Sequence, residues 1–237
     1  MHITVLSGAG LSAESGLGTF RDTDGLWTQY DLAEVATPEG FAADPAKVHA
    51  FYNARRKNAA EASPNAAHMA LAQLQTALGG RLTTVTQNVD SLLEAAGATD
   101  VLHMHGALDR AKCAECGHRY KALPIMQPSD PCPACKACAT RPDIVWFGEF
   151  PEHMDRIEQA LSTCDLFVAI GTSGQVYPAA GFVDLARQTG AQTLELTLEP
   201  SEITSRFHAH RHGPATELVP HGCLRCSTSP SHRLRSV

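Results

Sequence analysis

Two pairs of cysteines, each with two residues between its members, give the strongest chemical signal in this sequence. Cys113 and Cys116 form the first pair, and Cys132 and Cys135 form the second after an interval of 15 residues. Four thiolates at this spacing are typical of a tetrahedral structural Zn²⁺ site, in which no coordination position stays open for a substrate. Cys138 leaves an alternative, because Cys135 and Cys138 have the same spacing. We favour Cys132 and Cys135 as the second pair.

A glycine-rich segment near the start of the chain could bind a nucleotide. Residues 3–6 read as a short strand, and residues 8–13, Gly-Ala-Gly-Leu-Ser-Ala, then match the G-x-G-x-x-G/A pattern. In that pattern the glycines let the backbone approach a pyrophosphate at the start of a helix. The acidic residue that usually follows about 20 positions later is not evident. An ordinary glycine turn is the alternative, and a nucleotide would have to be held in an unusual way.

Two further groups of polar residues follow expected strands. Gln87, Asn88 and Asp90 come after residues 82–86, and could either bind a polar ligand at the edge of a sheet or cap the next helix. His105 ends the strand expected at residues 101–104. An imidazole there, with an ordinary pKa of about 6.5, is a candidate general base, and a hydrogen-bonded structural histidine is the alternative.

Strands and helices alternate along most of the chain, which favours a parallel β-sheet covered by helices on both faces. Further strands are expected at 144–147, 165–170 and 193–198, and helices at 42–78, 91–96, 152–163 and 179–189. The segment 112–141 has few aliphatic residues and needs the metal for its stability. We expect a nucleotide-binding domain from residues 1–34, 79–110 and 144–220, a helical module at 35–78, a zinc-binding module at 111–143 and a disordered tail at 221–237.

The composition limits the classes of partner. Of 237 residues, 43% are hydrophobic, and 19 basic residues against 25 acidic ones give a net charge of −6. This balance disfavours a nucleic-acid partner, including one bound by a zinc ribbon. No apolar run is long enough for a membrane span, and no basic segment starts a signal peptide, so we expect a cytoplasmic protein. The histidines at 208, 210 and 212 are expected in a solvated loop.

In chain order these segments resemble those of the sirtuins, a family of NAD-dependent protein-lysine deacylases. The resemblance runs from about residue 3 to about residue 220 and rests on residues 8–16 with 19–22, 86–90, His105–Gly106, the four cysteines, 146–149, 171–173 and 198–200. It implies an α/β fold, with a Rossmann-like doubly wound parallel sheet and a smaller domain made of a four-cysteine zinc module and a helical module. NAD and substrate would bind in the cleft between the two.

The resemblance also implies roles for single residues. Arg21 would contact phosphate, Phe20 would cover the reaction centre, Gln87 would contact a ribose, and Asn88 and Asp90 would line the nicotinamide pocket. The complete expected NAD-binding set is Gly8, Ala9, Gly10, Ser12, Ala13, Glu14, Thr19, Phe20, Arg21, Trp27, Gln87, Asn88, Val89, Asp90, Gly171, Thr172, Ser173, Thr197, Leu198, Glu199 and Ala215. His105 becomes the expected catalytic base, which takes a proton from the ribose hydroxyls. The products would be free lysine, nicotinamide and O-acyl-ADP-ribose.

Acylated-lysine proteins or peptides are the implied substrates, and they would add as a strand between residues 147–149 and 174–177. The expected substrate-binding residues are Tyr52, Arg55, Phe147, Gly148, Glu149, Val176 and Tyr177. Tyr52 and Arg55 resemble the Tyr-x-x-Arg pair of the class III branch and share one helix face. A phenol and a guanidinium can together bind a terminal carboxylate, so we expect removal of succinyl and malonyl groups and weaker deacetylation. Arg56 is expected at the surface.

Three alternatives keep the same pocket: a protein that is mainly a deacetylase, a mono-ADP-ribosyltransferase, and an NAD-sensing module without turnover. The sequence departs from the family pattern at three positions: Gly18 replaces a common Pro, Leu93 replaces a common His, and Thr197 replaces an Asn. The change at Thr197 would shorten or remove a contact with a ribose. We expect a monomer that binds neither nucleic acid nor membrane.

Overall fold

The computed structural model describes residues 1–18 and 30–227, and its largest unit is a six-stranded parallel sheet in the order β3-β2-β1-β7-β8-β9. The strands are β1 (Ile3–Ser7), β2 (Leu82–Thr86), β3 (Leu102–His103), β7 (Leu166–Ile170), β8 (Gln192–Thr197) and β9 (Ala209–His212). Every residue of β1 and β7 is buried, as expected for parallel strands covered on both faces. The strand order reverses between β1 and β7, where open α/β sheets bind their ligands.

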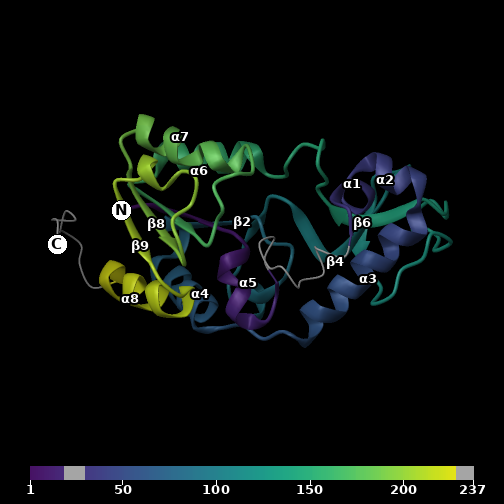
Figure 1. The fold of residues 1–237 in the computed structure, drawn as a ribbon, viewed down its shortest axis with the longest axis horizontal. Helices are drawn as coiled ribbons and strands as arrows, with labels where there is room; N and C mark the ends of the chain where they lie inside the picture. The colour runs from purple at the N-terminus through teal and green to yellow at the C-terminus, as the bar shows by residue number, and fades with distance from the viewer. Residues whose placement is uncertain (19–29, 228–237) are drawn as a thin grey trace.

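Helices cover both faces of this sheet (Figure 1). One face carries α4 (Ala66–Leu78), α5 (Leu92–Ala95) and α8 (Ala215–Ser227), and the other carries α6 (Met154–Thr163) and α7 (Phe182–Gln188). Side chains alternate between the faces along each strand: Ile3 and Val5 pack with α4, whereas Leu6 packs with α6 and α7. The sheet is therefore the middle of three layers, and the predicted doubly wound α/β fold is confirmed.

A smaller unit lies beside the carboxyl ends of β1 and β2 (Figure 1). It contains α1 (Leu32–Val35), α2 (Pro38–Ala43), α3 (Pro45–Glu61) and an antiparallel sheet of β5 (Arg119–Lys121), β4 (Gly106–Cys113) and β6 (Thr140–Ile144). Asp44 caps α3 by accepting from the Lys47 amide, and Pro45 occupies its first turn, where a missing N–H costs nothing. Phe51, Tyr52 and Trp146 belong to the core of this unit.

Short 3₁₀ helices complete the structure: η1 (Ala9–Leu11), η2 (Ala13–Ser15), η4 (Gly79–Arg81), η5 (Ala179–Gly181) and η6 (Thr204–Arg206). Among the described residues, no helix has both the length and the hydropathy needed to cross a bilayer.

The structure corrects the expected position of α4. Its segment was assigned to the helical module at 35–78, but Leu71 and Leu74 pack with Ile3 and Leu82 of the main sheet. Only α1, α2 and α3 belong to the smaller unit. Likewise β4 begins at Gly106 and β6 ends at Ile144, so the antiparallel sheet extends past both expected limits of the zinc-binding module.

The carboxyl-terminal part of the chain also differs from the expectation. β9 pairs with β8 where the sequence predicted a histidine-rich loop. α8 continues to Ser227, seven residues into the segment that was expected to be disordered. Val219 is buried against the main sheet and Leu218 packs beside it, so the helix is anchored just before Pro220.

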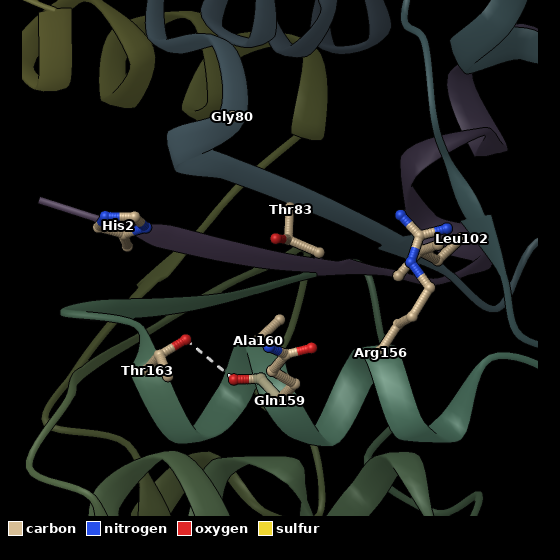
Figure 2. A pocket seen from close by; sticks show the side chains of 8 residues that line it. All are labelled: His2, Gly80, Thr83, Leu102, Arg156, Gln159, Ala160 and Thr163. Carbon is tan, nitrogen blue, oxygen red and sulfur yellow. Dashed lines mark hydrogen bonds between the residues drawn. The ribbon is translucent and has the colours of Figure 1, made fainter.

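A polar cavity of about 230 Å³ lies between α6 and the amino-terminal parts of β1 and β2 (Figure 2). His2, Thr83 and Arg156 are among its lining residues. None of the predicted site residues lines it, because those residues follow the opposite ends of the strands.

Candidate active site

Three polar segments meet at the carboxyl ends of β1, β2 and β3. Residues 8–12 follow β1, residues 87–90 follow β2, and His105 follows β3. Since β3, β2 and β1 are parallel neighbours, their carboxyl ends lie at one edge of the sheet, next to the smaller unit. The structure thus brings together the residues that the sequence singled out.

The glycine turn after β1 packs against the turn after β7. The amides of Gly8 and Gly10 donate to the carbonyls of Ile170 and Gly171, each at 2.9 Å. A Cβ on Gly8 would lie 2.8 Å from the Gly171 oxygen, and one on Gly10 would lie 2.7 Å from Gly171 Cα. These glycines are therefore required for contact between two protein segments, a reason the sequence analysis did not give. The segment continues as the 3₁₀ turns η1 and η2 rather than as the expected α-helix.

Ser12 connects the glycine turn to the polar turn after β2. Its buried hydroxyl donates to Asp90 Oδ2 at 3.0 Å and accepts from Asn88 Nδ2 at 3.1 Å. Asn88 Nδ2 also donates to the Gly8 carbonyl at 3.1 Å. Both amide protons of Asn88 are used in this way, so its side chain can meet a ligand only through Oδ1, which accepts. Val89 points instead into the core of the smaller unit.

A fully buried histidine that the sequence analysis missed supports Ser12. His68 Nδ1 accepts from the Asn65 amide at 3.2 Å, so the proton is on Nε2, which lies 3.3 Å from Ser12 Oγ. Burial lowers the pKa of His68, which keeps this ring neutral. Asn65 and His68 form the capping box of α4. A capping box is visible in sequence, but its contact with Ser12, 56 residues away, is not.

His105 is half-buried and has a defined tautomer. Its Nδ1 lies 3.2 Å from the Gln87 carbonyl, which can only accept, so Nδ1 carries the proton and Nε2 keeps a lone pair. Burial lowers the pKa of His105, and the bond to Gln87 only partly opposes this shift. The ring is therefore a neutral base at neutral pH. Gly106 has φ of +79° and leaves no room for a Cβ, which would lie 2.1 Å from the Asp143 carbonyl.

Tyr52 and Arg55 lie on one face of α3, as expected. Tyr52 is 1% exposed, and its hydroxyl oxygen accepts from Trp146 Nε1 at 3.0 Å. The Arg55 guanidinium is half-buried, with Cζ 5.6 Å from the centre of the Tyr52 ring. Burial lowers the pKa of Arg55, and its interactions with Tyr52 and Asp90 oppose this shift.

Arg56 is not the surface residue that the sequence predicted. Its side chain is buried, and its Nη2 donates to Asn53 Oδ1 at 2.5 Å. Its Nη1 also contacts the Leu108 carbonyl at 3.5 Å. Arg56 therefore joins α3 to β4, while Arg55 one position earlier faces elsewhere.

The two expected peptide-binding segments each carry an exposed aromatic side chain. The Phe147 and Tyr177 side chains are 52% and 66% exposed, Val176 is half-buried, and Gly148 has φ of +89°. Glu149 has a structural role: its carboxylate accepts from Arg141 at 2.6 and 2.8 Å and from the Trp146 amide at 2.9 Å. Only its backbone could pair with a peptide as expected.

The residues expected around adenosine follow β7 and β8 and begin α8. Among them, Gly171 and Ser173 are half-buried, and Leu198 and Glu199 are exposed. Thr197 is buried, and its hydroxyl has no hydrogen-bond partner within the described residues. The Glu14 carboxylate accepts from the Thr216 amide and hydroxyl in the first turn of α8, at 3.0 and 2.6 Å.

Four further residues of the expected NAD-binding set differ in exposure: Ala13 is exposed, Thr172 is buried, and Ala9 and Ala215 are half-buried. Thr19, Phe20, Arg21 and Trp27 lie outside the described residues.

The four cysteines of the two pairs converge in the smaller unit. The sulfurs of Cys113, Cys116, Cys132 and Cys135 all lie within 4.8 Å of one another, with contacts of 3.6 Å and 3.7 Å. Tetrahedral Zn²⁺ with Zn–S bonds of about 2.3 Å requires sulfurs about 3.8 Å apart, so this donor set fits zinc. Cys138 is directed away, toward the Ser129 carbonyl at 3.2 Å.

The backbone of both cysteine loops repeats one geometry. Gly117 and Lys136, each four residues after a cysteine, have φ of +70° and +68°. Their amides donate to the carbonyls of Cys113 and Cys132 at 3.0 Å. Glycine adopts this conformation readily. The first loop has a glycine at this position, whereas the second has a lysine.

Comparisons with known proteins show the family of this chain. The model of the Sir2 family matches residues 8–178. The chain is 58% identical to an NAD-dependent protein deacylase of Caulobacter vibrioides, over 93% of this chain and 94% of the relative. It is 53% identical to an NAD-dependent protein deacylase of Escherichia coli, over 92% and 80% of the two chains. The crystal structure of a Sir2 homologue in complex with NAD matches 95% of this chain and 89% of its own, with a TM-score of 0.86 and 35% identity. This chain therefore belongs to the Sir2 family, the sirtuins.

Proposed function

We propose that this chain is an NAD-dependent protein-lysine deacylase that removes succinyl and malonyl groups from lysine and, more weakly, acetyl groups. The observation that carries the proposal is the neutral His105 next to the Asn88–Asp90 turn, at the carboxyl ends of the neighbouring strands β3 and β2. The relatives named as NAD-dependent protein deacylases, 52–58% identical over most of the chain, support the reaction.

The proposed reaction uses His105 as the general base. NAD, when bound, would supply an electrophilic ribose carbon for attack by the acyl oxygen, with nicotinamide as the leaving group. His105 Nε2 then takes a proton from a ribose hydroxyl, because Nδ1 already donates to the Gln87 carbonyl. Asn88 accepts through Oδ1 from the nicotinamide amide, while Ser12 fixes the carboxylate of Asp90. The deprotonated ribose oxygen would attack the acyl carbon, and addition of one water would break the bond from that carbon to the lysine nitrogen. The products would be free lysine, nicotinamide and O-acyl-ADP-ribose.

Tyr52 and Trp146 support the preference for acidic acyl groups. The Tyr52 oxygen accepts from Trp146 Nε1, so its own O–H is directed elsewhere and calls for an acceptor. The half-buried Arg55 guanidinium lies beside this phenol. A phenol proton and a guanidinium suit the terminal carboxylate of a succinyl or malonyl group, whereas an acetyl methyl offers neither an acceptor nor a charge.

Zinc has a structural role in this proposal. Four thiolates fill a tetrahedral site, so the metal would hold the two cysteine loops together between β4 and β6. His105 directly precedes β4, whereas Cys113 is the last residue of that strand, and the proposed proton transfer uses His105 and not the metal.

The partners and location follow from the same features. We propose that acylated-lysine proteins are the substrates and that the chain acts as a monomer in a reducing cytoplasm, where the cysteines stay available for metal. The net charge of −6 supports the absence of a nucleic-acid partner.

One peptide carrying acetyl-, malonyl- or succinyl-lysine, incubated with and without NAD, tests the proposal. We expect NAD-dependent release of nicotinamide with all three forms and the highest kcat/KM with the two acidic ones. An acetyl peptide that reacts fastest would identify a deacetylase. ADP-ribose attached to protein would identify an ADP-ribosyltransferase, and NAD binding without turnover would identify a sensing module.

A further inference from the structure

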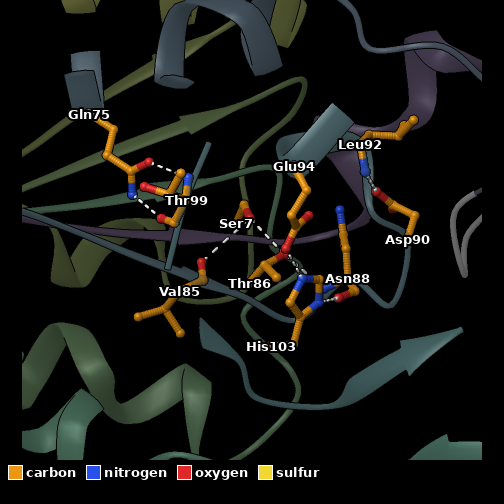
Figure 3. A network of polar contacts seen from close by, with 10 residues as sticks. All are labelled: Ser7, Gln75, Val85, Thr86, Asn88, Asp90, Leu92, Glu94, Thr99 and His103. Atoms are coloured by element: carbon orange, nitrogen blue, oxygen red, sulfur yellow. Dashed lines mark hydrogen bonds and ion pairs between the residues drawn. The ribbon is translucent and has the colours of Figure 1, made fainter. Parts of the chain in front are cut away.

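A second histidine, His103, lies two residues before His105, at the end of β3. It is 3% exposed, and Figure 3 shows its ring between Glu94 of α5 and the backbone of Asn88. Its Nδ1 lies 3.1 Å from the Asn88 carbonyl, and its Nε2 lies 2.7 Å from Glu94 Oε1. A carbonyl and a carboxylate only accept, so both nitrogens of His103 must donate. The ring is therefore an imidazolium that forms an ion pair with Glu94, in which His103 is buried and the Glu94 side chain is partly exposed.

The His103 ring of this ion pair also contacts the polar turn of the candidate site, residues 87–90. His105 Nδ1 donates to the carbonyl of Gln87, and His103 Nδ1 donates to the carbonyl of the next residue, Asn88. The Asn88 amide donates to Thr86 Oγ1 at 3.0 Å, so the backbone of this residue is fixed at both its donor and its acceptor. The same residue directs its side chain to Ser12. A shift of this carbonyl would move the side chains of Asn88 and Asp90 relative to His105.

We propose that His103, paired with Glu94, is a positioning residue that keeps the NAD-binding turn in register with His105. This inference rests on the proposed function, because that function assigns NAD as the ligand of the Asn88–Asp90 turn. Burial acts to lower the pKa of His103, but the hydrogen bond and charge of Glu94 and the Asn88 carbonyl outweigh it and raise this pKa. The charge of Arg110 acts in the opposite direction. His103 touches no ligand and takes no part in the proton transfer.

Two substitutions separate the two contacts of His103. His103→Asn places an amide nitrogen close to the position of Nδ1, so it can keep the bond to the Asn88 carbonyl. His103→Gln reaches the position of Nε2, so it can keep the contact with Glu94 but loses the bond to Asn88. Both variants remove the charge, and they are matched in polarity. We measure KM and kcat for NAD, KM for the acyl peptide and the NAD dissociation constant by calorimetry.

We expect His103→Gln to raise the KM and the dissociation constant for NAD roughly tenfold, the effect of losing one hydrogen bond from a charged donor. The KM for the peptide stays unchanged, and His103→Asn stays within about threefold of the original protein. Equal effects of the two variants, or none, would overturn the inference. If the original protein shows no turnover, the proposed function fails, and the NAD dissociation constants still test the role of His103.

Glu94→Gln tests the charge itself. The amide introduced at position 94 can donate to His103 Nε2, which leaves Nδ1–H on the Asn88 carbonyl. The ¹⁵N spectrum of the original protein at pH 7 is expected to show both nitrogens of His103 protonated, and that of the variant only Nδ1. A neutral His103 in the original protein, with Nδ1 unprotonated, would contradict the assignment.

Discussion

Replacement of Arg55 by methionine tests the acyl preference most sharply. Methionine keeps an unbranched apolar side chain but removes the guanidinium beside Tyr52. Hydrogen bonds to a charged partner contribute about 1.5–3 kcal/mol, and about 1.4 kcal/mol is a factor of ten. Arg55 is half-buried, so solvent screens the interaction and the lower end applies. We therefore expect kcat/KM for a succinyl peptide to fall roughly 10- to 30-fold.

The assay compares two peptides of one sequence, with succinyl- or acetyl-lysine, at saturating NAD. The loss is expected mainly in KM for the succinyl peptide, and kcat/KM for the acetyl peptide should stay within about twofold or rise, because its methyl group gains an apolar neighbour. Lys57→Met is the matched control: it removes one positive charge from an exposed position on the same helix and should change neither peptide. Equal losses on both peptides, or no loss on either, would refute a carboxylate-binding role for Arg55.

Three further predictions concern the base, the metal and the support of Tyr52. Burial lowers the pKa of His105, so kcat/KM should fall as the pH drops below this pKa, with a midpoint below about 6.5; a midpoint above pH 7 would argue against this base. The protein should contain one zinc per chain by mass spectrometry, chelation should lower its Tm, and Cys132→Ser should lose the metal whereas Cys138→Ser should keep it. Trp146→Phe leaves the Tyr52 oxygen without its donor and should lower the free energy of unfolding in urea by about 1–3 kcal/mol. The same substitution should narrow the preference for the succinyl peptide over the acetyl one, and an unchanged preference would refute the role given to Trp146.

The parts of the fold that the sequence predicted have strong local signals. β7 is a continuous apolar run and β1 is rich in aliphatic residues. The two cysteine pairs are recognised from the number of residues between their members. Both features could therefore be predicted without knowledge of distant contacts. α4 shows the limit of this approach. Its apolar stripe predicts a helix with one buried face, but only the packing of Leu71 on Ile3 shows that it covers the main sheet rather than the smaller unit.

Some residues of the candidate site could also be predicted from the sequence, and others could not. His105 and the Asn88–Asp90 turn follow expected strands, so their meeting at one edge of the sheet was predictable from topology. His68 and His103 were missed because their partners are distant or are backbone atoms: Ser12 lies 56 residues from His68, and His103 binds the carbonyl of Asn88. The reason for Gly8 and Gly10, contact with Gly171, likewise depends on the pairing of β1 with β7.

A count of products per molecule of NAD consumed tests the central claim most directly. For a succinyl peptide, mass spectrometry should find one nicotinamide, one O-succinyl-ADP-ribose and one free lysine for each NAD. The His105→Asn variant should form almost no O-succinyl-ADP-ribose while its Tm stays close to that of the original protein. Free lysine formed without NAD, or a His105→Asn variant as active as the original, would contradict the account.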